Sequence, residues 1–217
     1  MSATRKKRSP GRIGNVIVIS APSGSGKSTL VRKLMVAVPG MVFSISYTTR
    51  PMRAGEKNGR EYFFVTPATF KRMVAAGEFV EWADVHGELY GTAQRQIRKA
   101  QAAGKDVLLD IDVQGHRQVR RKMPDAVSIF LLPPSFRELE RRLRARHLDS
   151  PQAIRKRLHN AHKETRRWRE YDYLIVNDRL PRALRALCAV VQAARSRREV
   201  QQGSVQKILK TFGGKTK

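Results

Sequence analysis

The stretch S-A-P-S-G-S-G-K-S-T, residues 20–29, has the residue types and the spacing needed to hold a phosphate group. Gly24 and Gly26 carry no Cβ, so the chain can turn tightly there and direct successive backbone N–H groups at one anion. In loops of this kind the lysine, here Lys27, reaches the β- and γ-phosphates, and the hydroxyl of Ser28 can ligate Mg²⁺. These residues predict a site for a nucleoside triphosphate.

The elements on both sides of the loop support this interpretation. An apolar run at 16–19 predicts a buried strand that leads into it, and a helical pattern beginning near Lys27 brings a positive helix end to the same anion. The usual motif is G-x-x-x-x-G-K-[ST], and Ala21 stands where its first glycine is expected. An ordinary Gly/Ser-rich turn is the alternative, but it does not explain a strand, a loop and a helix in register. The residues expected at the triphosphate are Ala21, Pro22, Ser23, Gly24, Ser25, Gly26, Lys27, Ser28 and Thr29.

The composition is that of a soluble globular protein, because 41% of the 217 residues are hydrophobic and 29% are charged. No apolar run is long enough to cross a bilayer, so we expect no membrane partner. The single Cys188 excludes an internal disulfide and suits the reducing cytoplasm. Neither composition nor motif predicts an oligomeric state.

The net charge of +26 is concentrated in three segments, 5–12, 141–169 and 195–217. We expect the two terminal segments to be solvated, partly disordered tails. Such tails can bind polyanions non-specifically and in a salt-sensitive way. No specific nucleic-acid partner is predicted, because no aromatic stacking platform or nucleic-acid motif accompanies the charge. The middle segment differs because its helical pattern can present arginines to a phosphate.

The pattern along the chain predicts an α/β fold with a parallel sheet flanked by helices. Apolar runs that suit fully buried parallel strands alternate with helical patterns, at 16–20, 107–111, 127–132 and 173–176. Between the first two lies a smaller α/β insertion with strands at 62–65 and 79–85, after which Thr92 is expected to cap a helix that runs to about residue 103.

Several further segments resemble the guanylate kinase family. They are S-Y-T-T-R-P-M-R-A-G-E-x-x-G-x-x-Y-F-F, E-W-A-D-V-H-G-x-L-Y-G-T, L-L-D-I-D-V-Q-G and Y-D-Y-L-I-V-N-D, in the order of the family. The resemblance implies a P-loop core with two mobile parts and Mg²⁺-dependent transfer of the γ-phosphate of ATP to GMP. The implied divisions are a core (13–45, 97–139 and 169–201), a GMP-binding subdomain (46–96), a lid (140–168) and basic tails (1–12 and 202–217).

The resemblance assigns Arg50, Arg53, Tyr62 and Tyr90 to the phosphate of GMP. The chemistry is reasonable, because guanidinium groups match phosphate oxygens bidentately and tyrosine hydroxyls add directional donors. From the residues alone, Arg53 is equally well a solvated loop charge and Tyr62 a strand core residue.

Glu81 resembles the carboxylate with which the family reads guanine, and Ser46, Thr92 and Asp112 complete the implied base pocket. A carboxylate accepts two hydrogen bonds and so pairs with the N1–H and N2 amine of guanine, whereas adenine lacks that pair of donors. A solvent-facing strand position is the simpler interpretation of Glu81 from the sequence alone. No feature reads a ribose 2′-hydroxyl, so dGMP is expected to serve as well as GMP.

Asp110 ends an apolar strand, where sheets of this kind place their ligands, and it suits ordering of Mg²⁺ and its waters together with Ser28. Asp112 shares a face with it if the strand continues, or caps the helix that starts near residue 113. Both roles for Asp112 are compatible.

Three lid arginines match those of the family: Arg142, Arg146 and Arg157. Such arginines, delivered on closure, would stabilise the charge on the transferring phosphoryl group, and with Lys27 and Arg50 they form the expected catalytic set. Most other basic residues of the lid are expected to be solvated. Asn177 resembles an adenine-side residue and is otherwise a turn residue after the last strand.

Three rival functions follow from the same residues. Another small-acceptor kinase is disfavoured by Arg50, Arg53, Tyr62 and Glu81 together. A guanylate-kinase-like protein-binding module typically lacks the phosphate loop that is intact here. An RNA-binding protein acting through its tails would keep its affinity without the globular part and lose it in salt.

Overall fold

Five short parallel strands form the central sheet. The computed structural model describes residues 12–85, 87–145 and 150–212. The sheet has the strand order β2-β7-β1-β8-β9, and every neighbouring pair is parallel, as the sequence predicts. Its strands are β1 (Val16–Ser20), β2 (Met41–Phe43), β7 (Asp106–Asp110), β8 (Val127–Leu132) and β9 (Tyr173–Val176).

Helices cover both faces of this sheet because its strands are apolar on both sides. Ile17 and Ile19 point to the face covered by α1 (Lys27–Ala37) and α7 (Leu180–Arg195). Val16 and Val18 point to the face covered by α3 (Gln94–Ala102) and α4 (Val113–Lys122). Parallel pairing of β1 with β7 brings the carboxyl ends of the two strands together, and the phosphate loop follows directly from β1.

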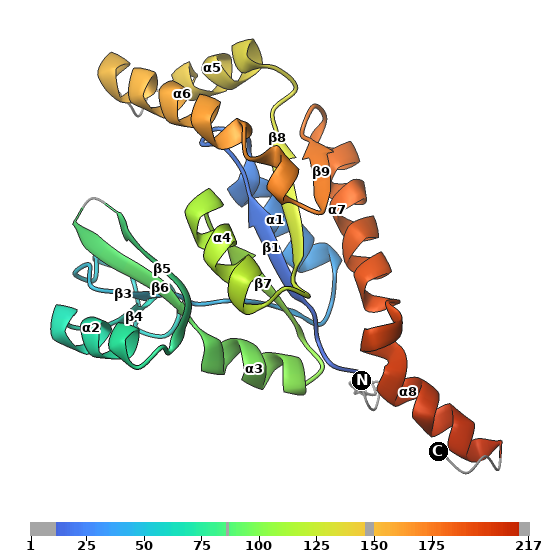
Figure 1. Ribbon diagram of the computed structural model, residues 1–217. Coiled ribbons are helices and arrows are strands. Elements are labelled where there is room, and N and C mark those ends of the chain that lie inside the picture. The colour runs from blue at the N-terminus through green and yellow to red at the C-terminus, as the bar shows by residue number, and fades with distance from the viewer. Residues whose placement is uncertain (1–11, 86, 146–149, 213–217) are drawn as a thin grey trace, which may run out of the picture.

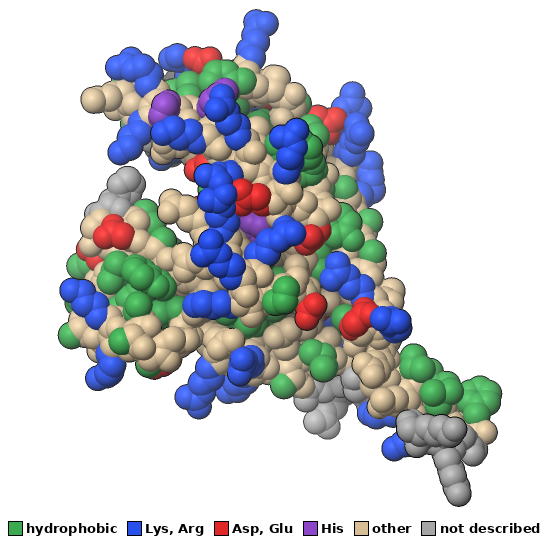
Figure 2. All heavy atoms as spheres, in the orientation of Figure 1, with side chains coloured by type: hydrophobic (Ala, Val, Ile, Leu, Met, Phe, Trp, Pro, Cys, Tyr) green, Lys and Arg blue, Asp and Glu red, His purple; other side chains and the backbone are tan. Residues whose placement is uncertain are grey.

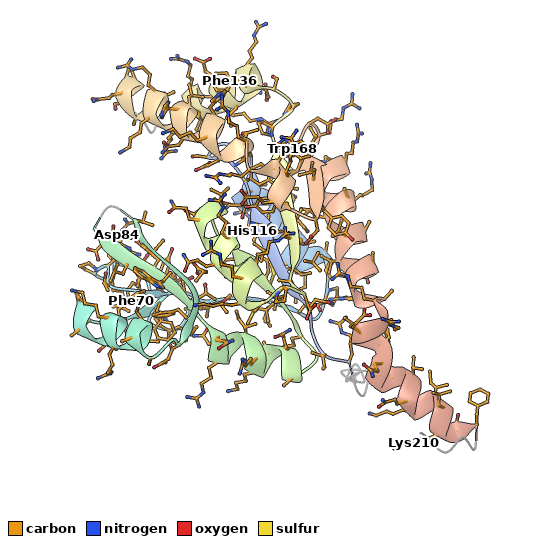
Figure 3. The ribbon with its side chains drawn as sticks, in the orientation of Figure 1. Phe70, Asp84, His116, Phe136, Trp168 and Lys210 are labelled. Carbon is orange, nitrogen blue, oxygen red and sulfur yellow. The ribbon has the colours of Figure 1, made fainter. Side chains whose placement is uncertain are left out.

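A second sheet builds the smaller lobe at the left of Figure 1. Its order is β4-β3-β6-β5, and the helix α2 packs on it through Phe70 (labelled in Figure 3) and Met73, against Phe79. We call this lobe the acceptor subdomain, after the role that the resemblance implies for it. Its elements are β3 (Tyr47–Thr48), β4 (Phe63–Phe64), α2 (Pro67–Ala75), β5 (Phe79–Val85) and β6 (Glu88–Ala93).

The expected helix cap at Thr92 is wrong. Thr92 lies in β6 and pairs with Glu81 of β5 in the antiparallel hairpin, and the helix begins two residues later, at Gln94. Pairing across the hairpin satisfies the backbone of Thr92, which leaves its hydroxyl for Glu81.

Two helices form the lid, at the top of Figure 1. They are α5 (Phe136–Arg144) and α6 (Pro151–Thr165), and they pack on each other through Leu139, Leu143, Ile154 and Ala161. Phe136, where the lid leaves the core, and Trp168, in the 3₁₀ turn η1 (Trp168–Glu170) where it returns, are labelled in Figure 3. Figure 2 shows the hollow that separates the lid from the acceptor subdomain.

The C-terminal segment differs from the expected disordered tail. It forms the helix α8 (Arg198–Thr211), which projects from the body in Figure 1. Val205, Ile208 and Leu209 recur at helical spacing on it and are 47%, 55% and 49% exposed. The N-terminal tail up to residue 11 and the last five residues lie outside the described part of the chain. Among the described helices, none is both long and apolar enough to cross a membrane.

A fully buried carboxylate, Asp106, lies at the amino end of β7, opposite the phosphate loop. It forms ion pairs with Arg12 and with Arg195 of α7, whose Nε is 2.7 Å from the carboxylate. The backbone N–H of Asn15 donates to the same group at 2.8 Å. These contacts join the start of β1, the start of β7 and the end of α7.

Candidate active site

The phosphate loop has the geometry that its sequence predicts. Gly24 and Gly26 adopt φ angles of 92° and 87°, in the left-handed region that glycine favours, and α1 begins at Lys27. The side-chain amide of Asn177 donates to the carbonyl of Ser25 at 2.7 Å and so braces the loop from the end of β9. The loop lines a cavity of about 320 Å³ whose remaining wall is Glu164 of the lid.

The close approach of the lid explains why a residue with a side chain fits poorly at position 24. A Cβ at this position would lie 2.9 Å from Leu143 and 3.0 Å from Leu139 of α5. The lid therefore packs directly on the phosphate loop, and its position and the shape of the loop depend on each other.

Lys27 and Asp110 meet at the carboxyl edge of the sheet. The Nζ of Lys27 is 2.5 Å from Oδ1 of Asp110, and Ile19 of β1 pairs in register with Asp110 of β7. The hydroxyl-bearing Ser28 lines the same loop cavity as Lys27. The expected lysine and acidic residue are thus brought together beside the loop.

Glu81, Thr92 and Asp112 come together as expected of a base pocket. Glu81 is only 6% exposed, so the simpler interpretation of a solvent-facing strand residue is wrong. The Thr92 hydroxyl donates to Oε1 of Glu81 at 2.6 Å. Burial raises the pKa of the Glu81 carboxyl, Thr92 lowers it and the charge of Asp112 raises it again. Asp112 also caps α4, because its carboxylate accepts from the N–H groups of Gln114 and Gly115.

Arg50, Tyr62 and Tyr90 form a second cluster in the acceptor subdomain. The Arg50 guanidinium lies 5.5 Å from the centroid of the Tyr62 ring, and the Tyr62 and Tyr90 rings are 5.7 Å apart. Glu56 holds the guanidinium at 2.8 Å, and its carboxylate also accepts from the backbone N–H of Arg53. The pKa of Glu56 is lowered chiefly by the Arg50 hydrogen bond.

The two other residues that the resemblance assigns to GMP are Arg53 and Ser46. Arg53 is in an exposed loop, and Ser46 immediately precedes β3, where its carbonyl accepts from the N–H of Phe63. Both belong to the chain that leads from the core into the acceptor subdomain.

Arg142 of the lid faces the donor side. Its Nε is 2.8 Å from Glu138, and its guanidinium donates to the carbonyl of Asn177 at 3.0 Å. Arg142 and Asn177 line a cavity of about 470 Å³ together with Gly24, Gly26 and Thr29. Arg157 lies on α6, and Arg146 falls outside the described residues.

Four residues of the site were not expected from the sequence: Glu56, Gly115, Glu138 and Glu164. A Cβ on Gly115 would lie 3.0 Å from Oε2 of Glu81, so this glycine makes room for the carboxylate. The spacing of Glu138 to Arg142, and of Arg157 to Glu164, was a usable signal, because residues four or seven apart share a helix face.

A phosphate loop with a lysine and an acid, a lid that carries arginines, and a separate lobe with a buried carboxylate define a P-loop phosphotransferase that handles two nucleotides. The family model described as "Guanylate kinase" matches residues 13–194. A guanylate kinase of Koribacter versatilis is 54% identical over 87% of this chain and 82% of its own length, and one of Dechloromonas aromatica is 53% identical over 83% and 90%.

Among solved structures, the guanylate kinase of Anaplasma phagocytophilum matches with a TM-score of 0.68 and 34% identity, over 86% of this chain and 89% of that one. The chain therefore belongs to the guanylate kinase family. It is an enzyme, and the reaction of its family is phosphoryl transfer from ATP to GMP.

Proposed function

We propose that the two halves of the site divide the substrates of this reaction between them. ATP binds at residues 21–29, with Arg142 and Asn177 beside it, and GMP binds in the acceptor subdomain. The observation that carries the proposal is the buried Glu81 carboxylate, which Thr92 orients with one hydrogen bond of 2.6 Å. A buried acceptor of this kind suits the adjacent N1–H and N2 donors of guanine and leaves adenine without a matching pair.

The acceptor phosphate is assigned to the Arg50 cluster. With Tyr62 and Tyr90 beside it, the guanidinium supplies charge-assisted donors and the phenols supply directional ones. Glu56 keeps Arg50 in place without a substrate. Arg53 and Ser46 complete the pocket from the loop. Because none of the residues assigned here has to contact the ribose 2′-hydroxyl, the proposal extends to dGMP.

The donor set beside the loop fits Mg²⁺. The carboxylate of Asp110 and the hydroxyl of Ser28 are hard oxygen ligands, and Mg²⁺ prefers one or two such groups together with substrate phosphates and waters. When bound, the ion would neutralise charge on the β- and γ-phosphates. Lys27, whose Nζ pairs with Asp110, could turn to the phosphates once the ion compensated the charge of the Asp110 carboxylate.

The protein's contribution to the chemical step is positional and electrostatic. Lys27, Arg50, Arg142, Arg146 and Arg157 bring positive charge to the oxygens of the transferring group, and no covalent intermediate is required. Lid closure over the hollow of Figure 2 would exclude water that otherwise competes with GMP as acceptor. We place the enzyme in the cytoplasm, where a free Cys188 remains reduced.

A coupled assay of ADP release tests the proposal, with ATP and each of GMP, dGMP, AMP, UMP and CMP. We expect GMP and dGMP alone to support turnover.

K27A should lower kcat by about a hundredfold or more, because it removes a positive charge that stabilises the transferring phosphoryl group. E81Q should lower kcat/KM for GMP by about 30- to 150-fold, because about 2–3 kcal/mol of charge-assisted hydrogen bonding is lost. The affinity for ATP should not change. Equal losses for both substrates, or turnover of AMP by the wild type, would contradict the assignment.

A further inference from the structure

Glu164 is an acidic side chain of the lid that faces the phosphate loop. It lies in the last turn of α6 and lines the loop cavity with Ser23, Lys27 and Ser28. Among the described residues that line this cavity, it is the only acid and the only one from outside residues 21–29. The expected ATP site thus contains a negative charge supplied by the protein itself.

The loop explains why a carboxylate faces it. Gly24 and Gly26 adopt the left-handed conformation, the N-terminus of α1 adds its positive end, and Lys27 adds a full charge. Burial and the neighbouring Asp112 raise the pKa of Glu164, whereas Lys27 and the N–H of Ser23 lower it. The groups that would hold ATP phosphates therefore act on the Glu164 carboxylate when no phosphate is bound.

The position of Glu164 on α6 links it to a lid arginine. Arg157 precedes it by seven residues, which is nearly two full turns, so both side chains leave the helix on the same side. Ala161 lies between them and packs against α5. A shift or rotation of α6 that removes Glu164 from the cavity also moves Arg157.

We propose that Glu164 is a positioning residue that occupies the phosphate cradle of the ATP-free enzyme and is displaced by ATP. The inference rests on the donor site proposed above. Phosphates and a carboxylate repel each other in a cavity of about 320 Å³. Binding of ATP then expels Glu164 and drives the movement of α6 that repositions Arg157. The carboxylate lowers the affinity for ATP and keeps the lid from its closed position until ATP has entered.

Calorimetric binding of ADP with Mg²⁺, and of inorganic tripolyphosphate, to E164Q tests the proposal. We expect both ligands to bind about three to ten times more tightly than to wild type, because one like charge near the phosphates is removed. KM for ATP should fall by a similar factor. The affinity for GMP and kcat should stay within about twofold, because Glu164 has left the cradle before the chemical step.

Two variants control for charge and structure. E140Q removes the same charge from α5, where Glu140 pairs with Arg144 at 2.7 Å and does not line the cavity; its ADP affinity should equal that of wild type. E164D keeps the charge on a side chain one methylene shorter and should stay within about twofold of wild type. Thermal unfolding of each variant shows whether it folds as wild type does.

Three results would overturn the inference. One is unchanged or weaker ADP binding in E164Q, and another is a fall in kcat with KM for ATP unchanged, because Glu164 would then act in the closed complex. The third is that E164D or E140Q binds ADP as tightly as E164Q. If the proposed ATP site itself were wrong, the result would be different: K27A would bind ADP and turn over as well as wild type.

Discussion

In the proposed guanine site, Glu81 and Thr92 show how one residue pair can set base specificity. Thr92 faces Glu81 directly across the hairpin, so its hydroxyl holds one carboxylate oxygen at 2.6 Å. Gly115 leaves room at the other oxygen, where a Cβ would be only 3.0 Å away. The carboxylate is thereby held in one orientation before guanine arrives, which limits the conformational entropy lost on binding.

The raised pKa of Glu81 predicts how GMP binding depends on pH. Guanine requires the ionised carboxylate, and burial shifts protonation to a pH above the ordinary value of about 4.3. Over the pH range between neutrality and that ordinary value, KM for GMP should rise as the pH falls, while KM for ATP changes little. Steady-state kinetics across this range measure it. E81Q should not show the rise, and a rise that persists in that variant would assign it to another group.

At the scale of elements, the contact between α5 and the phosphate loop couples lid and donor site. G24A would introduce a residue at a φ of 92°, with its Cβ 2.9 Å from Leu143. The strained backbone costs about 1–2 kcal/mol, and the steric clash pushes α5 outward. We therefore expect KM for ATP to rise about tenfold or more and KM for GMP to stay nearly constant.

G77A is the matched control for this prediction. Gly77, after α2, also has a positive φ, of 65°, but nothing lies within 4 Å of the position that a Cβ would take there. G77A should lose about 1 kcal/mol of stability without a selective rise in KM for ATP. Equal kinetic behaviour of G24A and G77A would show that the lid contact has no role in ATP binding.

Local patterns made some elements predictable. The loop and the start of α1 at Lys27 follow from the order of a few adjacent residues. The strands of the central sheet are uniformly apolar, so their parallel, covered arrangement was also predictable. Asp112 as the cap of α4 needed only the sequence around it.

Other features depend on contacts that sequence distance conceals. The burial of Glu81 depends on α4, which packs against its strand, and the alternation of a strand does not tell which face is covered. The sequence predicts Thr92 as a helix cap because its hydroxyl suits a cap as well as a strand. At α8, the basic charge predicts a disordered tail, although Val205, Ile208 and Leu209 have helical spacing.

At the scale of the whole molecule, Asp106 stabilises the end of the sheet that lies away from the phosphate loop. Burial alone would raise the pKa of its carboxyl, but hydrogen bonds from Arg12, Asn15 and Arg195 together lower it. The two arginine side chains are only 13% and 17% exposed. Loss of the carboxylate would leave both with little solvent to compensate.

D106N should therefore lower the free energy of unfolding by about 3–5 kcal/mol at neutral pH, as measured by urea denaturation. The native pKa lies below the unfolded value of about 3.9, so the stabilisation is present above that pH and is lost as the pH falls through the native pKa. The difference between the two proteins should accordingly shrink below about pH 4. E199Q, at a pair whose carboxylate is 67% exposed, should leave the free energy of unfolding nearly unchanged. A similar loss in both variants would contradict a special role for the buried group.

The acceptor subdomain, the lid and the sheet each have an apolar cluster of their own. Native-state hydrogen exchange should therefore show at least two units, 63–93 and 136–165, that open at lower free energy than the central strands. Mass spectrometry at low denaturant concentration measures this. A single opening energy for all three regions would contradict it.

Separate interiors allow the lobes to rotate at short junctions, such as 44–46 and the boundary between β6 and α3, without any partial unfolding. The apolar clusters stay buried when the lobes move relative to one another. Turnover rate and thermal stability can then vary independently among relatives. Substitutions at the junctions change the turnover rate, and substitutions inside the apolar clusters change the thermal stability.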